Sequence, residues 1–226
     1  MKAFVILHGQ TDFDAGGRII GGSDQALNET GKAQAREAAK SLQSKGIDMI
    51  LSSPQTHTME TSEIIAEGLG LGASKITKGL ILKERAFGDF EGRLKSEVDM
   101  FVLCSWFGHA ITPNGETLKE TVGRVIPYMN NMVKIFRTKT MLIVVPDQVA
   151  RVLFWFFNGF PGPGNEHIIE PGNCAIYEFD TDDIPQEIRD FSSVAALPVS
   201  SEGTDDPGRL LTQAEIDDLI EEILTK

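Results

Sequence analysis

Short apolar runs alternate with longer amphipathic stretches along the first 180 residues of the chain. The runs have the length of buried β-strands, and the stretches between them repeat apolar residues at the spacing of one helical face. Strands are predicted at 5–7, 49–51, 80–82, 141–145 and 175–179, and helices at 30–44, 54–67 and 116–136. This alternation predicts a three-layer α/β sandwich with a mainly parallel central sheet.

Individual residues predict where these helices begin, end or bend. Asn28 and Gly46 are suitable start and stop residues for the first of them. Pro127 is expected to kink the third, because proline lacks the amide proton of the helical hydrogen bond. The longest apolar stretch, residues 152–157, is too short to span a bilayer, so a helix packed on the sheet is predicted there.

Composition narrows the class of protein. The 226 residues are 41% hydrophobic, enough to bury a full core, and the net charge of −12 disfavours nucleic acid and anionic membrane surfaces as partners. Cys104 and Cys174 have no metal or redox spacing, as expected of reduced thiols. The first strand begins after two residues, which leaves no room for a signal peptide, so a cytoplasmic location is expected.

The end of the first strand carries the most specific pattern. Residues 3–7 run into His8-Gly9-Gln10-Thr11, and further short motifs follow in a fixed order. These motifs are Gly17-Arg18, the segment from Gly21 to Gly31, Gln34-Ala35, Ser52-Ser53-Pro54, Leu82-Lys83-Glu84, Gly88 to Gly92, Pro113 to Thr117 and Arg124. Together they resemble the histidine phosphatase superfamily, also called phosphoglycerate-mutase-like.

The resemblance implies a fold and a set of functional residues. In that family a histidine after the first strand accepts a phosphoryl group, and a glutamate donates a proton. His8 and Glu84 stand at these positions and are the candidate catalytic residues. The candidate substrate-binding residues are Thr11, Asp14, Arg18, His57, Asp147 and Gln148. A small-molecule ligand is expected, with no cofactor and no resident metal.

Three positions depart from the family pattern. Leu7 and His57 stand where the resemblance implies phosphate-binding arginines, and Asp147 stands where it implies a second histidine. The charge of the pocket is therefore about three units more negative than the family pattern implies. The Coulomb energy of each charge pair at about 4 Å is up to about 4 kcal/mol. The sequence predicts a degenerate phosphate pocket with weak affinity for a phosphate dianion.

Two classes of function remain open. The first is a pseudophosphatase or repurposed member that binds a ligand without hydrolysing phosphate esters. The second is an enzyme: either a phosphomonoester hydrolase helped by Arg18, Arg85 or Lys83, or an acid/base enzyme for another substrate that uses His8 and Glu84. The imidazoles and carboxylates are also a candidate cation site, although no local ligand spacing supports one. For Asp147, a structural role as a helix N-cap is as good an interpretation as a role in ligand binding.

The C-terminal segment departs from the family. We expect a domain over residues 1–190, a linker over 191–211 and an amphipathic helix over 212–226, which begins with the capping box Thr212 to Glu215. Its apolar face either docks on the domain or serves, through residues 212–224, for self-association or a protein partner. Residues 93–112 form an unusually apolar stretch at the place where members of the family often carry a helical lid, and if this stretch covers the pocket, the pocket is apolar as well as acidic.

Overall fold

A five-stranded sheet forms the centre of the protein. The computed structural model describes residues 1–99, 114–160 and 171–191. The strands are β1 (Lys2–Leu7), β2 (Met49–Ser52), β3 (Ile76–Lys78), β4 (Met141–Val145) and β5 (Ile176–Asp180), in the order β3-β2-β4-β1-β5. The first four are parallel, and β5 is antiparallel to β1. The prediction of a mainly parallel sheet is confirmed.

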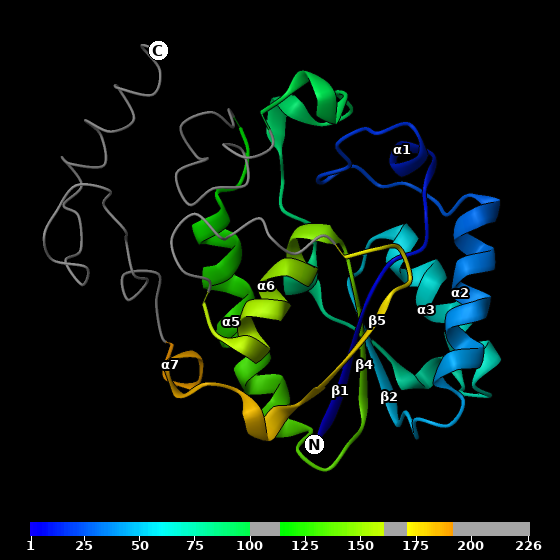
Figure 1. Ribbon diagram of the computed structural model, residues 1–226, viewed down its shortest axis with the longest axis vertical. Helices are drawn as coiled ribbons and strands as arrows, with labels where there is room; N and C mark the ends of the chain where they lie inside the picture. The colour runs from blue at the N-terminus through cyan, green and yellow to red at the C-terminus, as the bar shows by residue number, and fades with distance from the viewer. Residues whose placement is uncertain (100–113, 161–170, 192–226) are drawn as a thin grey trace, which may run out of the picture.

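Helices cover both faces of this sheet. Figure 1 shows α2 (Glu29–Leu42) and α3 (Thr56–Gly68) on one side, and α5 (Leu118–Ile135) and α6 (Asp147–Asn158) on the other. The shorter helices are α1 (Asp12–Ala15), α7 (Gln186–Arg189), η1 (Ala73–Lys75), η2 (Leu80–Leu82), η3 (Gly88–Phe90), η4 (Lys95–Glu97) and η6 (Thr181–Asp183). None of the described helices is both long and apolar enough to cross a membrane.

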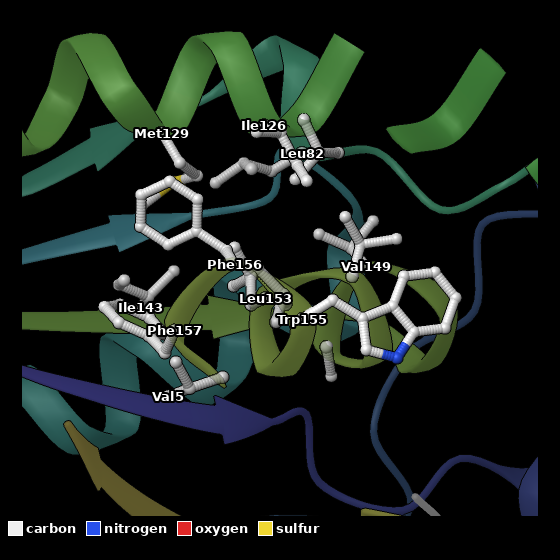
Figure 2. Packing of buried hydrophobic residues seen from close by; sticks show 14 of the residues in the cluster. Val5, Leu82, Ile126, Met129, Ile143, Val149, Leu153, Trp155, Phe156 and Phe157 are labelled. Carbon is white, nitrogen blue, oxygen red and sulfur yellow. The ribbon is translucent and has the colours of Figure 1, made fainter. Parts of the chain in front are cut away.

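The core follows from the alternation of side chains along each strand. Val5 and Ile143 point toward α5 and α6, whereas their neighbours Phe4 and Leu142 point toward α2 and α3. The apolar run 152–157 lies in α6, as predicted, and packs between the sheet and α5 (Figure 2). Each fully buried aliphatic or aromatic side chain contributes roughly 1.5–3 kcal/mol.

One predicted strand is wrong. Leu80–Leu82 forms the 3-10 helix η2, and the edge strand is β3, directly before it. Leu82 alone of the three is buried, with Leu80 71% exposed. The Leu82 amide donates a hydrogen bond to the Gly79 carbonyl, and this bond closes a turn. The apolar triplet therefore anchors a turn through one residue instead of pairing along the sheet.

Three predicted helix signals have different outcomes. Asn28 caps α2 as predicted, because its side chain accepts a hydrogen bond from the Gly31 amide. Asp147 is not an N-cap: Pro146 holds that position, and Asp147 is the first residue of α6. Pro127 lies inside α5, which continues through it. The predicted linker beyond its first residue, Phe191, and the predicted C-terminal helix lie outside the described residues, as does most of the segment 93–112, so these remain predictions.

The loop after β1 is held against the start of α2. A Cβ atom on Gly31 would lie 2.1 Å from the Gln10 carbonyl oxygen, and one on Gly9 would lie 2.5 Å from the Gly31 carbonyl oxygen. The two backbone segments approach so closely that neither position has room for a side chain. This contact fixes the chain immediately after His8.

We predict that Gly31→Ala destabilises the protein even though alanine favours helices. The clash with the Gln10 backbone costs about 1–3 kcal/mol of overpacking, which exceeds the gain in helix propensity of up to about 1 kcal/mol. Thr30→Ala, at the exposed neighbouring position of α2, is the matched control, with an expected change within about 0.5 kcal/mol. Urea unfolding of both variants tests this. Equal stability of the two would contradict the close contact.

Candidate active site

A cavity of about 190 Å³ lies at the carboxyl ends of β1 and β4. In open α/β sheets this edge is the usual place for a ligand. Six of the eight candidate residues line the cavity: His8, Asp14, Arg18, His57, Glu84 and Asp147. Thr11 and Gln148 do not, and each contacts a lining residue from behind. The fold thus brings together residues that lie up to 139 positions apart in the sequence.

His8 is a buried, neutral imidazole with its proton on Nδ1. It follows β1, and Nδ1 lies 2.7 Å from the Gly9 carbonyl oxygen, which can only accept. In the neutral ring Nδ1 therefore carries the proton, and Nε2 keeps its lone pair. Burial lowers the pKa of His8, although the Asp14 carboxylate, 3.9 Å from Nδ1, opposes this shift. Nε2 is in the state that a nucleophile or base requires.

Glu84 is a buried carboxyl that holds its proton at neutral pH. Burial is the main cause of a pKa raised to about 8, and repulsion by Asp147 adds to it. The amides of Arg85 and Gln148 donate to its carboxyl oxygens at 2.8 and 3.2 Å and partly offset the shift. The Gln55 side chain accepts from the Glu84 amide at 2.7 Å. Glu84 is thus held in place and able to donate a proton.

His57 lies beside His8 and is also neutral. It stands in the first turn of α3, fully buried, with its ring centroid 4.2 Å from that of His8. Its Nδ1 donates to the Gln25 carbonyl at 3.2 Å. Burial, together with the neighbouring His8, lowers the pKa of His57 to about 3. Its Nε2 is buried and has no hydrogen-bond partner among residues 1–99, 114–160 and 171–191.

Asp147 brings a negative charge to the cavity. Its carboxylate accepts from the Gln148 side chain at 3.0 Å and the Arg151 guanidinium at 3.3 Å. It stands in the first turn of α6, where the helix dipole favours an anion. Gln148, whose backbone amide bonds Glu84, acts as a positioning residue for that carboxyl.

Thr11 and Asp14 form a capping box at α1. The Thr11 hydroxyl accepts from the Asp14 amide and donates to the Asp14 carboxylate at 2.9 Å. The Thr11 amide donates to the same oxygen. The polar groups of Thr11 are therefore used in holding Asp14 near His8. Its predicted contact with substrate stays a prediction.

Two exposed cations, Arg18 and Lys95, line the cavity in the described part of the chain, and only Arg18 was predicted. Arg18 donates to the Gly92 carbonyl at 2.7 Å. Lys95 was missed, because its approach depends on long-range pairing: its amide donates to Gly17, and Leu94 forms a bridge with Arg18. The other two cations considered lie elsewhere. The Arg85 guanidinium is buried against the Glu116 carbonyl, and Lys83 lines a separate cavity.

The lining combines acid, base and apolar groups. Leu7, Ile19, Ile20 and Phe87 supply the apolar part. Within residues 1–99, 114–160 and 171–191, no group of three or more His, Cys, Asp or Glu side chains is arranged to hold a metal ion. The chemistry available is proton transfer by Glu84 and nucleophilic or basic action by His8.

Curated relatives match most of the chain. The 2,3-bisphosphoglycerate-dependent phosphoglycerate mutase of Bartonella quintana is 31% identical over 192 residues, which cover 79% of this chain and 92% of that protein. The phosphoglycerate mutase of Schizosaccharomyces pombe is 28% identical over 165 residues, covering 69% and 78%.

Solved structures share the fold. YhfR of Bacillus stearothermophilus superposes with a TM-score of 0.69 at 21% identity, covering 83% of this chain and 98% of that one. A mycobacterial glucosyl-3-phosphoglycerate phosphatase superposes with a TM-score of 0.65 at 23% identity, covering 78% and 88%. The model of the histidine phosphatase superfamily (branch 1) matches residues 4–193. With 190 of its 226 residues inside that match, the chain belongs to the histidine phosphatase superfamily.

Proposed function

We propose that the protein is a slow phosphomonoester hydrolase that uses His8 as nucleophile and Glu84 as general acid. One observation carries this proposal: a neutral imidazole with a free Nε2 and a protonated carboxyl line the same cavity. The relatives named above include phosphoglycerate mutases and a phosphatase, which supports phosphate esters as the substrate class.

The two residues suffice for a two-step reaction. His8 Nε2 forms a bond to phosphorus while the bond from phosphorus to the leaving oxygen breaks, and Glu84 gives its proton to that oxygen. Water then attacks the phosphohistidine, and the Glu84 carboxylate takes a proton from the water. Phosphate leaves, and His8 and Glu84 return to their starting states. Asp14 and Gln148 act as positioning residues for this pair.

The charges around the cavity support a slow reaction. Leu7 is apolar, His57 is neutral, and the Asp147 carboxylate repels an incoming anion. The remaining cations, Arg18 and Lys95, are solvent-exposed and therefore screened. Stabilisation of transition-state charge is a large part of enzymatic phosphoryl transfer. A pocket with these groups gives weak affinity and a low rate.

The second candidate is a pseudophosphatase that binds a small molecule without catalysis. The same three residues, Leu7, His57 and Asp147, favour it, because they stand at a site suited to anions elsewhere in the family. An acid/base reaction on a substrate without phosphate would use His8 and Glu84 in the same protonation states. Binding of a protein partner through residues 212–224 is a separate prediction that either candidate accommodates.

Phosphorylation of His8 separates the candidates. We expect purified protein, incubated with acetyl phosphate and measured by intact mass spectrometry under non-acidic conditions, to gain one phosphoryl group. His8→Ala abolishes the gain, whereas Glu84→Gln slows hydrolysis of a phosphate ester by about 10²-fold or more, as for loss of a general acid. Unmodified wild-type protein that hydrolyses no phosphate ester would favour the pseudophosphatase.

The pH dependence of hydrolysis follows from the two pKa shifts. Glu84 must be protonated, so kcat/KM, once corrected for the ionisation of the substrate's own phosphoryl group, falls as pH rises through about 8. His8 must be neutral, so the acidic limb lies below its ordinary pKa of 6.5. Asp147→Asn removes a charge that raises the pKa of Glu84 and therefore moves the alkaline limb to lower pH. An alkaline limb unaffected by Asp147→Asn would exclude Glu84 as the acid.

A cation at position 7 is expected to strengthen anion binding. Leu7 lines the cavity beside His8, so Leu7→Arg places a guanidinium next to the bound phosphoryl group. We predict a fall in KM of at least about tenfold, equivalent to ~1.4 kcal/mol. Leu7→Met, which conserves volume and adds no charge, leaves KM unchanged. Equal KM values for the two variants, both folded by circular dichroism, would show that the ligand does not approach this wall of the cavity.

A further inference from the structure

One buried acceptor at the cavity has no partner. His57 lines the cavity and is fully buried, and its Nε2 makes no hydrogen bond with any part of the chain that the structure describes. Because Nδ1 donates to the Gln25 carbonyl, Nε2 of the neutral ring bears a lone pair and no proton. A buried polar atom without a partner is costly, and such atoms are usually satisfied by a ligand or an ordered water. The group that completes this site must bring a hydrogen-bond donor.

The groups around His57 make the inner end of the cavity rich in acceptors. His8 presents a second Nε2 lone pair from the end of β1, and Asp147 presents a carboxylate from α6. Among the described residues that line the cavity, Glu84 can donate a proton, and the half-buried Asn173 side-chain amide donates to the His8 carbonyl at 2.9 Å.

Other charges act on this end from further away. Asp14 lies behind His8 in α1, and Asp24 acts on His57 from the loop before α2. Arg18 and Lys95 line the cavity as exposed cations. These two cations, together with the family match, favour an anionic ligand over an organic ammonium ion.

The phosphoryl group of an ester exists in two ionic forms that differ at this site. The dianion carries no hydrogen and meets only lone pairs at His57, His8 and Asp147. The monoanion, which forms below a pKa of about 6, carries one P–OH group. That group can donate to an acceptor that otherwise stays unpaired, and the smaller charge reduces repulsion from Asp147.

We propose that the cavity selects a phosphoryl group in its protonated monoanionic form, with the P–OH donating to His57 Nε2. This inference rests on the proposed phosphate-ester substrate and adds to it that His57 is the specificity-determining residue. His57 recognises the proton on the phosphoryl group, whereas an arginine at this position would recognise its negative charge.

A pair of matched anions isolates the hydrogen-bond donor. Methylphosphonate, at a pH below its second pKa, and methanesulfonate are both monoanions of nearly the same shape, and only the phosphonate has an OH group. Titration calorimetry of both at one pH compares them against the same protonation state of the protein. We expect methylphosphonate to bind about tenfold or more tightly than methanesulfonate, as for one hydrogen bond to an otherwise unpaired buried group.

Variants at position 57 assign the selectivity. His57→Phe keeps an aromatic ring of similar shape but removes the acceptor, so the two anions bind with equal affinity. His57→Arg supplies donors and a charge, so methanesulfonate binding strengthens and the preference disappears. Gln43→Arg, on the exposed end of α2, also adds one positive charge and keeps the wild-type preference. Thermal unfolding verifies that each variant is folded.

The inference is overturned if wild-type protein binds the two anions equally, if it binds neither, or if folded His57→Phe keeps the preference. These results are independent of the phosphohistidine measurement. A phosphorylated His8 together with absent selectivity would remove the role of His57 and leave the hydrolase proposal intact, whereas selectivity without phosphorylation would retain the site and remove the hydrolase.

Discussion

Burial of the Glu84 carboxyl, with the Asp147 carboxylate acting on it, is the interaction on which the chemistry of the cavity depends. Burial is the main cause of the raised pKa, and repulsion by Asp147 adds to it, so Glu84 keeps its proton to a pH of about 8. His8 and His57 respond to the same burial in the opposite direction and stay neutral. Among the described residues that line the cavity, Glu84 thus supplies a proton, His8 and His57 supply lone pairs, and the cations Arg18 and Lys95 are exposed.

The sheet and its helical layers were predictable because burial leaves a clear pattern in the sequence. β1 and β4 are buried on both faces and read as continuous apolar runs. The helices α2 and α5 were recognisable because each covers the sheet with one face only, so that their apolar residues recur at helical spacing. The triplet Leu80–Leu82 was misassigned because apolar composition alone does not distinguish an edge strand from a turn anchored by one buried leucine.

The candidate site was predictable where its residues follow strand ends. His8 follows β1, and Asp147 stands one residue beyond Pro146 at the end of β4, so their meeting is a property of the parallel sheet. Lys95 follows no strand and reaches the cavity through pairing with the Arg18 loop, which no local signal reveals. The tautomers of His8 and His57 depend on the Gly9 and Gln25 carbonyls and likewise could not be inferred from sequence spacing.

The central claim is that a protonated Glu84 lines the same cavity as a neutral His8, and infrared difference spectroscopy of the Glu84 carboxyl tests it most directly. The C=O stretch of a protonated carboxyl is distinct from the carboxylate bands, and Glu84→Gln identifies the contribution of this residue. The account predicts that the protonated band persists through neutral pH and disappears around pH 8. Loss of the band near the ordinary glutamate pKa of 4.5 would contradict it.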